Sequence, residues 1–174
     1  MRAAVAANKN LFVLRHGLAV EAGTAGYATD ADRPLTAEGK AKLREIAAAM
    51  QKLGLDFDLI LSSPYKRARQ TAEIVGEKLK KKIELSDTLT PQGSAKELID
   101  LLNRLEPQPG NVLLVGHEPS LSQLISLLIS GDRSATVLLK KGALAKLSVE
   151  SLKHGQCAAL EWLLTPKQMA MIAG

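Results

Sequence analysis

Three stretches of this chain follow an apolar run with residues that bind anions or transfer protons. They are residues 11–17 (LFVLRHG), 59–67 (LILSSPYKR) and 112–117 (VLLVGH). Two arginines and two histidines stand directly after these apolar runs or one helical turn further on: Arg15, His16, Arg67 and His117. Side chains of these types, if brought together, would make a site for a compact and multiply charged anion such as phosphate.

The chemistry expected at such a site is phosphoryl transfer. Arginine binds two oxygens at once through its planar fork and stays charged in the working pH range. A neutral imidazole nitrogen is able to attack phosphorus and to carry the phosphoryl group as a covalent intermediate, while fixed positive donors stabilise the charge on the transferring oxygens. We therefore expect Arg15 to hold the phosphoryl oxygens, His16 to attack, and Gly17 to keep the backbone out of the way.

The hydrophobic pattern predicts short buried strands that alternate with amphipathic helices. The expected strands are 11–14, 59–61, 83–85 and 112–115, and the expected helices are 36–53, 64–79, 94–105 and 119–129. Segments 144–149 and 158–164 are expected to pair as a hairpin, followed by a short terminal helix opened by Thr165 and Pro166. This order predicts a three-layer α/β/α fold, with a mainly parallel sheet and an antiparallel addition.

The ends of these elements are where the candidate residues stand. Thr36 and Ser94 are expected N-caps, and Ser63 with Pro64 is expected to open the second helix. In an open α/β sheet, ligands sit beyond the carboxyl ends of the parallel strands, and helix N-termini there favour anions. A lone histidine after a strand is usually a hydrogen-bonded turn residue, so each stretch is weak evidence by itself. The recurrence of phosphate-compatible residues at three strand ends is what predicts a shared site.

Size and composition favour one globular domain. The chain has 174 residues, of which 46% are hydrophobic, enough to bury a sizeable core. We expect residues 1–9 to form a flexible extension and residues 10–174 to form the domain. The single cysteine, Cys157, excludes an internal disulfide and is typical of a reducing cytosol. Because no apolar segment is long enough to span a bilayer, we expect a cytoplasmic protein with no membrane partner.

The formal charge of +5 favours acidic partners, although a merely soluble basic surface explains it equally well. The densest basic run is 78–82 (KLKKK). It stands at the end of an expected helix, where cations offset the negative end of the helix dipole. A nucleic-acid face would also need stacking aromatic residues or a wider basic stripe, and only 3% of the residues are aromatic. We therefore do not expect nucleic acid as a partner.

The candidate residues resemble the signature of the histidine phosphatase superfamily, also called phosphoglycerate mutase-like. The resemblance runs from residue 11 to about residue 164. It rests on three motifs: Arg15-His16-Gly17, Ser63-Pro64 with Arg67, and Gly116-His117. The small size of the chain, the segment 30–36 (DADRPLT) and the segment 89–93 (LTPQG) further resemble the compact SixA-type phosphohistidine phosphatases.

The resemblance implies a phosphoglycerate mutase-like fold and a phosphatase that forms a phosphohistidine intermediate on His16. It implies a phosphate pocket of Arg15, Arg67 and His117, with His117 protonated or donating to the phosphoryl oxygens. Arg33 would be a further phosphate or substrate contact.

The sequence also bears on a serine, two acidic residues and a possible metal near this pocket. The hydroxyl of Ser62 touches phosphate or only ends a strand, and the sequence leaves both possibilities open. Asp30 and Asp32 are expected to be solvated loop charges. No metal or other cofactor is implied, and the sequence shows no carboxylate cluster that would hold a metal.

The missing general acid favours one substrate class. Larger members of the superfamily carry a glutamate acid on an inserted segment near the third strand, and residues 85–93 leave no room for one. An alkoxide leaving group needs a proton during bond cleavage, whereas the imidazole of a phosphoramidate is protonated beforehand. We therefore expect a metal-independent phosphatase that acts on phosphohistidine in a protein, for which a histidine phosphotransfer domain is the family-level suggestion.

Two alternatives stay open. Glu118 could serve as the acid, although a helix-start carboxylate is its ordinary role, and the protein would then be a phosphomonoesterase acting on small phosphorylated molecules. The second alternative is a non-catalytic module that binds phosphate or nucleic acid. The oligomeric state does not follow from the sequence.

Overall fold

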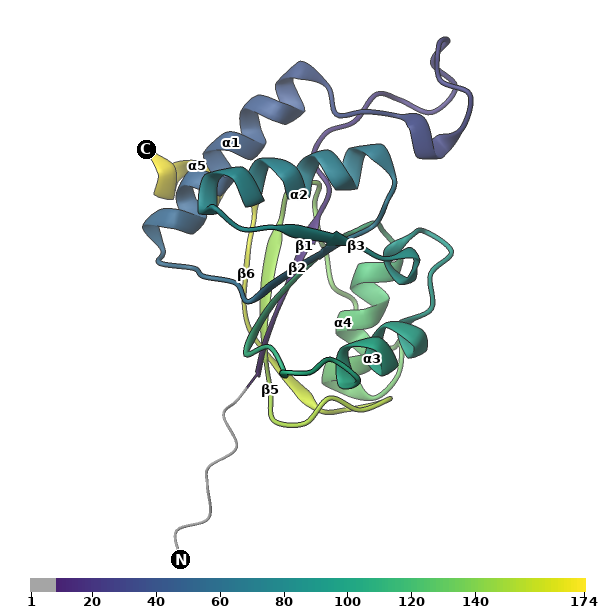
Figure 1. The fold of residues 1–174 in the computed structure, drawn as a ribbon, viewed down its shortest axis with the longest axis vertical. Helices are drawn as coiled ribbons and strands as arrows, with labels where there is room; N and C mark the ends of the chain where they lie inside the picture. Colours follow the sequence, from purple (N-terminus) through teal and green to yellow (C-terminus); the bar gives the residue numbers. More distant parts are fainter. Residues whose placement is uncertain (1–8) are drawn as a thin grey trace, which may run out of the picture.

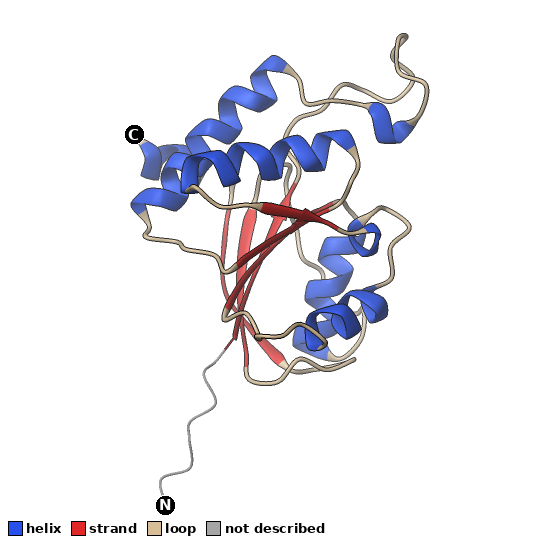
Figure 2. Cartoon of the chain, viewed as in Figure 1, coloured by secondary structure: helices blue, strands red, loops and turns tan. Residues whose placement is uncertain are grey.

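The computed structural model describes residues 9–174, and Figures 1 and 2 show their arrangement around one sheet. The sheet has six strands in the order β3-β2-β4-β1-β5-β6. Their bounds are β1 Lys9–Arg15, β2 Leu59–Ser62, β3 Ile83–Leu85, β4 Asn111–Gly116, β5 Leu144–Val149 and β6 Ala158–Leu164. The first four strands are parallel, β5 runs antiparallel to β1, and β6 runs antiparallel to β5. The predicted parallel sheet with an antiparallel addition is confirmed.

Helices cover both faces of the sheet. Their bounds are α1 Ala37–Lys52, α2 Lys66–Leu79, α3 Ala95–Asn103, α4 Ser120–Ser130 and α5 Pro166–Ala173, with short 3₁₀ turns η1 Asp30–Asp32 and η2 Asp87–Leu89. In Figure 2, α1, α2 and α5 lie on one face, while α3 and α4 lie on the other. The three-layer α/β/α architecture expected from the alternation of strands and helices is therefore confirmed.

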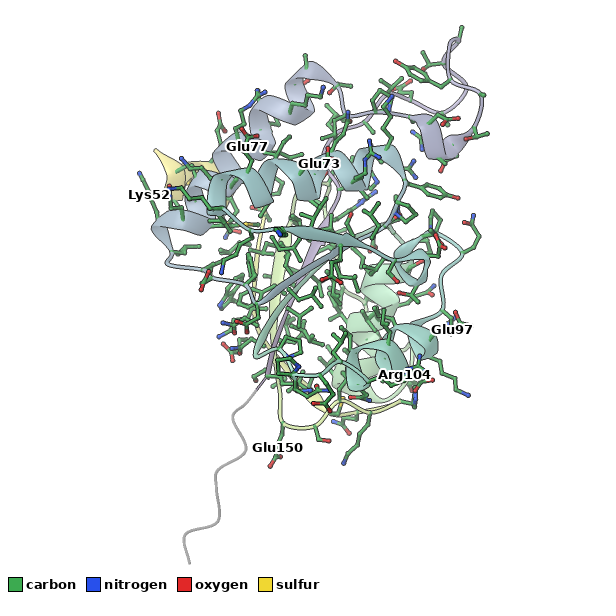
Figure 3. All side chains as sticks on the ribbon, in the orientation of Figure 1. Lys52, Glu73, Glu77, Glu97, Arg104 and Glu150 are labelled. Carbon is green, nitrogen blue, oxygen red and sulfur yellow. The ribbon has the colours of Figure 1, made fainter. Side chains whose placement is uncertain are left out.

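The alternation of side chains along β1 builds two separate cores. Phe12 and Leu14 pack with the apolar faces of α1, α2 and α5. Leu11 and Val13 pack with α3 and α4. This follows from the period of two in a strand, which places successive side chains on opposite faces. In Figure 3 the labelled charged residues, such as Glu77 on α2 and Glu150 after β5, lie at the outside of the molecule.

One expected helix start is wrong. The helix expected from Pro64 begins two residues later, at Lys66, and its N-cap is Tyr65 without a side-chain capping bond. The hydroxyl of Ser63 accepts the amide of Tyr65 at 3.2 Å and closes a local turn. Because this turn uses the cap that the sequence suggested, the helix starts after it. The cap at Thr36 is confirmed, since its hydroxyl accepts the amide of Gly39 at 2.9 Å.

The expected flexible extension, residues 1–9, lies outside the described residues except for Lys9, which is the first residue of β1. The division into this extension and one domain stays a prediction. Among residues 9–174, no helix combines the length and the apolar character needed to cross a bilayer.

Candidate active site

Three neighbouring strands end at one edge of the sheet and bring the predicted residues together. Arg15 is in register with Gly116, and Ser62 is in register with Val115. The chain beyond the strands is held by further backbone bonds, because His16 N–H donates to the Gly116 carbonyl at 3.1 Å. As a result, the imidazole rings of His16 and His117 lie 5.1 Å apart, centre to centre.

His16 is held as a neutral imidazole with a defined tautomer. Its Nδ1 lies 2.7 Å from the carbonyl oxygen of Gly17, which only accepts hydrogen bonds, so Nδ1 carries the proton and Nε2 carries the lone pair. Burial lowers the pKa of His16 to about 3; the bond to Gly17 opposes this, and the positive charges of Arg67 and Arg15 lower it further. A free lone pair on Nε2 is what nucleophilic attack on phosphorus requires.

His117 is held in the orientation that makes it a hydrogen-bond donor. Its Nε2 lies 2.8 Å from the hydroxyl of Ser63. That hydroxyl can donate to Nε2 while it accepts the amide of Tyr65, and in that tautomer the imidazole proton sits on Nδ1. Burial, followed by the charge of Arg67, lowers the pKa of His117 to about 4. His117 therefore acts as a neutral Nδ1–H donor at neutral pH.

Arg67 stands in the first turn of α2 and is buried in the site. Its Nε donates to His16 Nε2 at 3.3 Å. Its two terminal nitrogens donate to the carbonyl and the carboxylate of Asp30, at 2.7 and 2.9 Å. The guanidinium thus reaches both the nucleophile and the turn η1. This contact spans 37 residues of sequence.

Asp30 is a loop charge whose side chain is 49% exposed, as expected, but it also pairs with two arginines. Its carboxylate also accepts Arg33 Nε at 2.8 Å, so one side chain joins Arg33 to Arg67. Partial burial raises the pKa of Asp30, but hydrogen bonds from Arg33 and Arg67 outweigh this and hold the pKa below its usual value. Arg33 donates further to the Val20 carbonyl at 2.6 Å. Arg33 therefore borders the site through Asp30.

Arg15 connects the site to the loop that precedes β5. It is half-buried, and its Nη1 donates to the carbonyl of Leu139 at 3.0 Å. Burial lowers the pKa of Arg15, while the nearby charge of Glu118 raises it. Among the described residues, the only buried side-chain nitrogens or oxygens without a hydrogen-bond partner are Arg15 Nε and His117 Nδ1. Buried unpaired donors are rare in folded proteins, and both belong to this site.

Ser62 has one of the two roles that the sequence left open, because it is the last residue of β2. Ser62 is fully buried, and its hydroxyl donates to the Ser63 carbonyl at 3.0 Å, so the neighbouring Ser63 is the serine that reaches a site histidine. A Cβ on Gly17 would lie 2.6 Å from a methyl carbon of Leu43 on α1. Gly17 is therefore required for the close packing of α1, and its amide donates to Thr71 at 3.1 Å.

Sequence reasoning missed Tyr65 as part of the site. Its ring centre lies 5.2 Å from that of His117, and the guanidinium carbon of Arg67 lies 5.4 Å from the Tyr65 ring centre. The ring thus forms an aromatic wall beside two charged or donating groups. The available signals were its place between Ser63 and Arg67 and its rarity, since the chain has only two tyrosines.

The remaining candidates occupy ordinary positions. Glu118 accepts the amide of Ser122 at 2.9 Å, as a helix-start carboxylate does. Within residues 9–174 there is no group of three or more histidine, cysteine or acidic side chains that could hold a metal ion.

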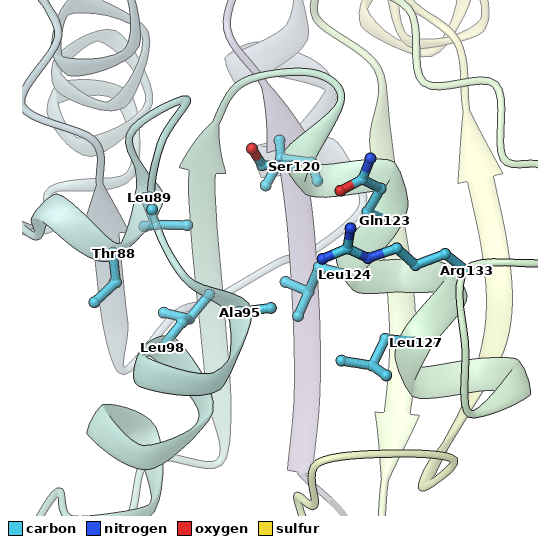
Figure 4. A pocket seen from close by; sticks show the side chains of 11 residues that line it. Thr88, Leu89, Ala95, Leu98, Ser120, Gln123, Leu124, Leu127 and Arg133 are labelled. Carbon is cyan, nitrogen blue, oxygen red and sulfur yellow. The ribbon is translucent and has the colours of Figure 1, made fainter.

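A separate cavity of about 60 Å³ lies between η2, α3 and α4 (Figure 4) and is lined by none of the predicted site residues.

The lowered histidine pKa values predict a pH-dependent stability. Below pH 6.5 the unfolded chain protonates both histidines, whereas folded His16 and His117 stay neutral down to about pH 3 and 4. The unfolded state therefore binds more protons in this window, and the stability that is fully present above pH 6.5 is lost as the pH falls. Between pH 8 and pH 5 we expect these two groups to remove about 2–4 kcal/mol from the free energy of unfolding.

The measurement is denaturant unfolding of the wild type, of His16→Gln/His117→Gln and of His154→Gln at several pH values. The double variant should lose much less stability toward pH 5. His154 is exposed and paired with Asp100, so its variant should follow the wild type. Equal pH slopes in the wild type and the double variant would contradict the assignment.

Comparisons with known proteins agree with this geometry. The sequence model of the histidine phosphatase superfamily (branch 1) matches residues 11–93. The chain is 39% identical over 139 residues to an uncharacterized protein of Picosynechococcus sp. This match covers 79% of this chain and 83% of the relative. It is 28% identical over 165 residues to the phosphohistidine phosphatase SixA of Escherichia coli, covering 92% of this chain and 96% of the relative.

A solved structure of the protein histidine phosphatase SixA complexed with tungstate superposes on this chain with a TM-score of 0.76 at 28% identity. The match covers 92% of this chain and 99% of the other. The fold that the sequence resemblance implied is therefore confirmed over nearly the whole chain.

Proposed function

Because the chain belongs to the histidine phosphatase superfamily and is a phosphatase, we propose that it hydrolyses phosphohistidine on a protein substrate through a covalent phosphoryl group on His16. The observation that carries this proposal is the buried His16 imidazole, whose Nδ1 proton is bound by the Gly17 carbonyl and whose Nε2 lone pair lies beside Arg67. In this arrangement Nε2 carries no proton and accepts the hydrogen bond of Arg67 Nε, which an attack on phosphorus would displace.

In the first step, His16 Nε2 attacks phosphorus and forms a new P–N bond. The P–N bond to the substrate histidine breaks, and its electron pair returns to the substrate imidazole, which leaves with a proton acquired beforehand from solvent. Arg67 and the unpaired groups Arg15 Nε and His117 Nδ1 would bind the phosphoryl oxygens as charge builds on them, and their closeness to His16 or lack of another partner supports this role. Arg33 would contribute to this binding indirectly, because it pairs with the same Asp30 carboxylate as Arg67.

In the second step, water attacks phosphorus of phosphorylated His16. The Nε2–P bond breaks, its electron pair returns to the His16 ring, and inorganic phosphate leaves. The attacking water loses a proton to solvent or phosphate, so the enzyme returns to its starting state without a metal or other cofactor. His16, the nucleophile of the first step, is the leaving group of this second step. Its low pKa makes it a better leaving group.

The carboxylates near the site support a P–N bond as the target. Glu118 holds the Ser122 amide. Asp30, with its lowered pKa, is ionised at neutral pH. The Asp30 carboxylate therefore carries no proton for an alkoxide leaving group, as cleavage of a phosphomonoester requires, and the Glu118 carboxyl is already engaged at the start of α4. A protein bearing phosphohistidine is accordingly the proposed partner, and the cytoplasm the proposed location.

The test is a substrate comparison on purified protein with a chelator present. We expect kcat/KM for a phosphohistidine-bearing phosphotransfer protein to exceed that for each of a panel of small phosphomonoesters by at least about 100-fold, because protonation of the leaving group alone is worth about 10²–10⁴. Faster turnover of a monoester would replace the proposed substrate class. Oligonucleotide binding that weakens with salt, with no turnover of any substrate, would instead support a non-catalytic module.

A further inference from the structure

A second concave surface lies at the same sheet edge as the phosphate site, on the side of α1 and α5. It is a groove of about 660 Å³. The strand register explains its place, because Leu14 near the end of β1 pairs with Leu144, and Leu144 pairs with Leu164 at the end of β6. Arg15 lines the groove and also lies close enough to lower the pKa of His16. Arg15 is thus the residue that the groove shares with the predicted phosphate site.

The groove is strongly cationic. Its basic lining residues are Arg15, Lys42, Lys140, Lys141 and Lys167, against one carboxylate, Glu45. The four lysines are exposed. Lys42 pairs with Glu38 at 2.5 Å, whereas the other three make no ion pair within the described residues. These three lysines therefore remain available to an acidic partner.

Between the lysine side chains the groove is apolar. Leu18, Pro166 and Ala170 line it, and it has no aromatic lining residue. A nucleic acid would need aromatic side chains on which to stack its bases, and inorganic phosphate would gain nothing from apolar contacts. A polypeptide segment with acidic side chains and some apolar surface matches both features.

Backbone hydrogen bonds and a helix cap fix the segments that carry Lys140, Lys141 and Lys167. Gly142 N–H donates to the carbonyl of Arg15 at 3.0 Å and lies 3.2 Å from that of His16, so the turn with Lys140 and Lys141 is fastened to the end of β1. Lys167 lies in the first turn of α5, which a capping box between Thr165 and Gln168 closes. Because the backbone that carries these lysines is already fixed, less conformational freedom is lost when a partner binds.

We propose that this groove binds an acidic segment of the phosphorylated protein next to its phosphohistidine. The inference rests on the proposed function and deepens it, because it states what the protein substrate must carry beside the phosphoryl group. The positive groove would hold that segment while the phosphohistidine enters the adjoining site past Arg15.

The experiment uses two phosphohistidine peptides of equal length, one with four acidic residues flanking the phosphohistidine on each side and one with glutamine in their place. At low ionic strength the wild type should hydrolyse the acidic peptide with a kcat/KM about 10-fold higher, through KM, because several weak ion pairs add up. Higher salt should reduce this preference. In Lys140→Gln/Lys141→Gln the preference should fall below about threefold, with hydrolysis of the neutral peptide unchanged.

The matched control is Lys78→Gln/Lys82→Gln, which removes the same charge from exposed lysines that do not line the groove. It should keep the full preference. Equal rates on both peptides in the wild type, or an unchanged preference in Lys140→Gln/Lys141→Gln, would overturn the groove as the docking site. Failure of the wild type to hydrolyse either peptide would instead overturn the proposed function.

Discussion

Replacing His16 with alanine is expected to lower kcat for phosphohistidine hydrolysis by about 10⁴-fold or more, because the covalent route is lost with its nucleophile. His16 Nε2 is the imidazole nitrogen whose lone pair lies beside Arg67, and its proton-bearing partner Nδ1 is bound to the Gly17 carbonyl. His117 Nε2 instead lies 2.8 Å from the hydroxyl of Ser63, whereas the hydrogen bond to His16 Nε2 comes from Arg67, which is itself a candidate phosphate donor. The measurement is phosphate release under saturating substrate.

Trapping the intermediate makes this test specific. Wild-type protein mixed with labelled phosphohistidine substrate and quenched within milliseconds should carry an acid-labile label, which His16→Ala lacks. The matched control is His154→Ala, which removes the third histidine of the chain. His154 is exposed and pairs with Asp100 at 2.7 Å, so the control should keep its label and its rate. Turnover of His16→Ala within tenfold of the wild type would rule out the covalent mechanism.

Replacing Arg67 with alanine is expected to lower kcat/KM by about 10²–10³-fold, as removal of one fixed donor to a developing oxyanion does. Arg67 is buried beside His16, and its planar guanidinium is of the type that binds phosphoryl oxygens. The matched control is Arg69→Ala, two residues along the same helix. Arg69 is exposed, and its ion pair in the described part of the chain is with Glu73, at 3.3 Å, so kcat/KM should change less than about threefold.

The ion pair between Arg67 and Asp30 offers a second explanation that the same experiment separates. Arg67→Ala would leave the Asp30 carboxylate near the site without its arginine partner, and that charge could repel the substrate. The double variant Arg67→Ala/Asp30→Asn removes the charge. If loss of the phosphoryl donor is the cause, the double variant stays about as slow as Arg67→Ala. Recovery to within tenfold of the wild type would assign Arg67 to the neutralisation of Asp30.

Local pattern was sufficient for the architecture. The apolar runs that include Leu14 and Val115 predicted buried parallel strands, and the helical periodicity between them predicted helices on both faces. The strand order itself was not predicted, but parallel strands end at one edge of a sheet, and the ends of β1, β2 and β4 do meet there. The proximity of His16 and His117 was therefore predictable from residues that are 101 positions apart.

The sequence by itself determined the elements and the residue types at their ends, because strand and helix periods are local properties of the chain. Only the tertiary structure decided which atoms meet. Ser62 ends β2 inside the core while Ser63 reaches His117, a difference of one residue that depends on the backbone turn. Likewise, Asp30 contacts Arg67 because of the conformation of the loop before α1. The conformation of a loop does not follow from a periodic pattern of hydrophobic residues.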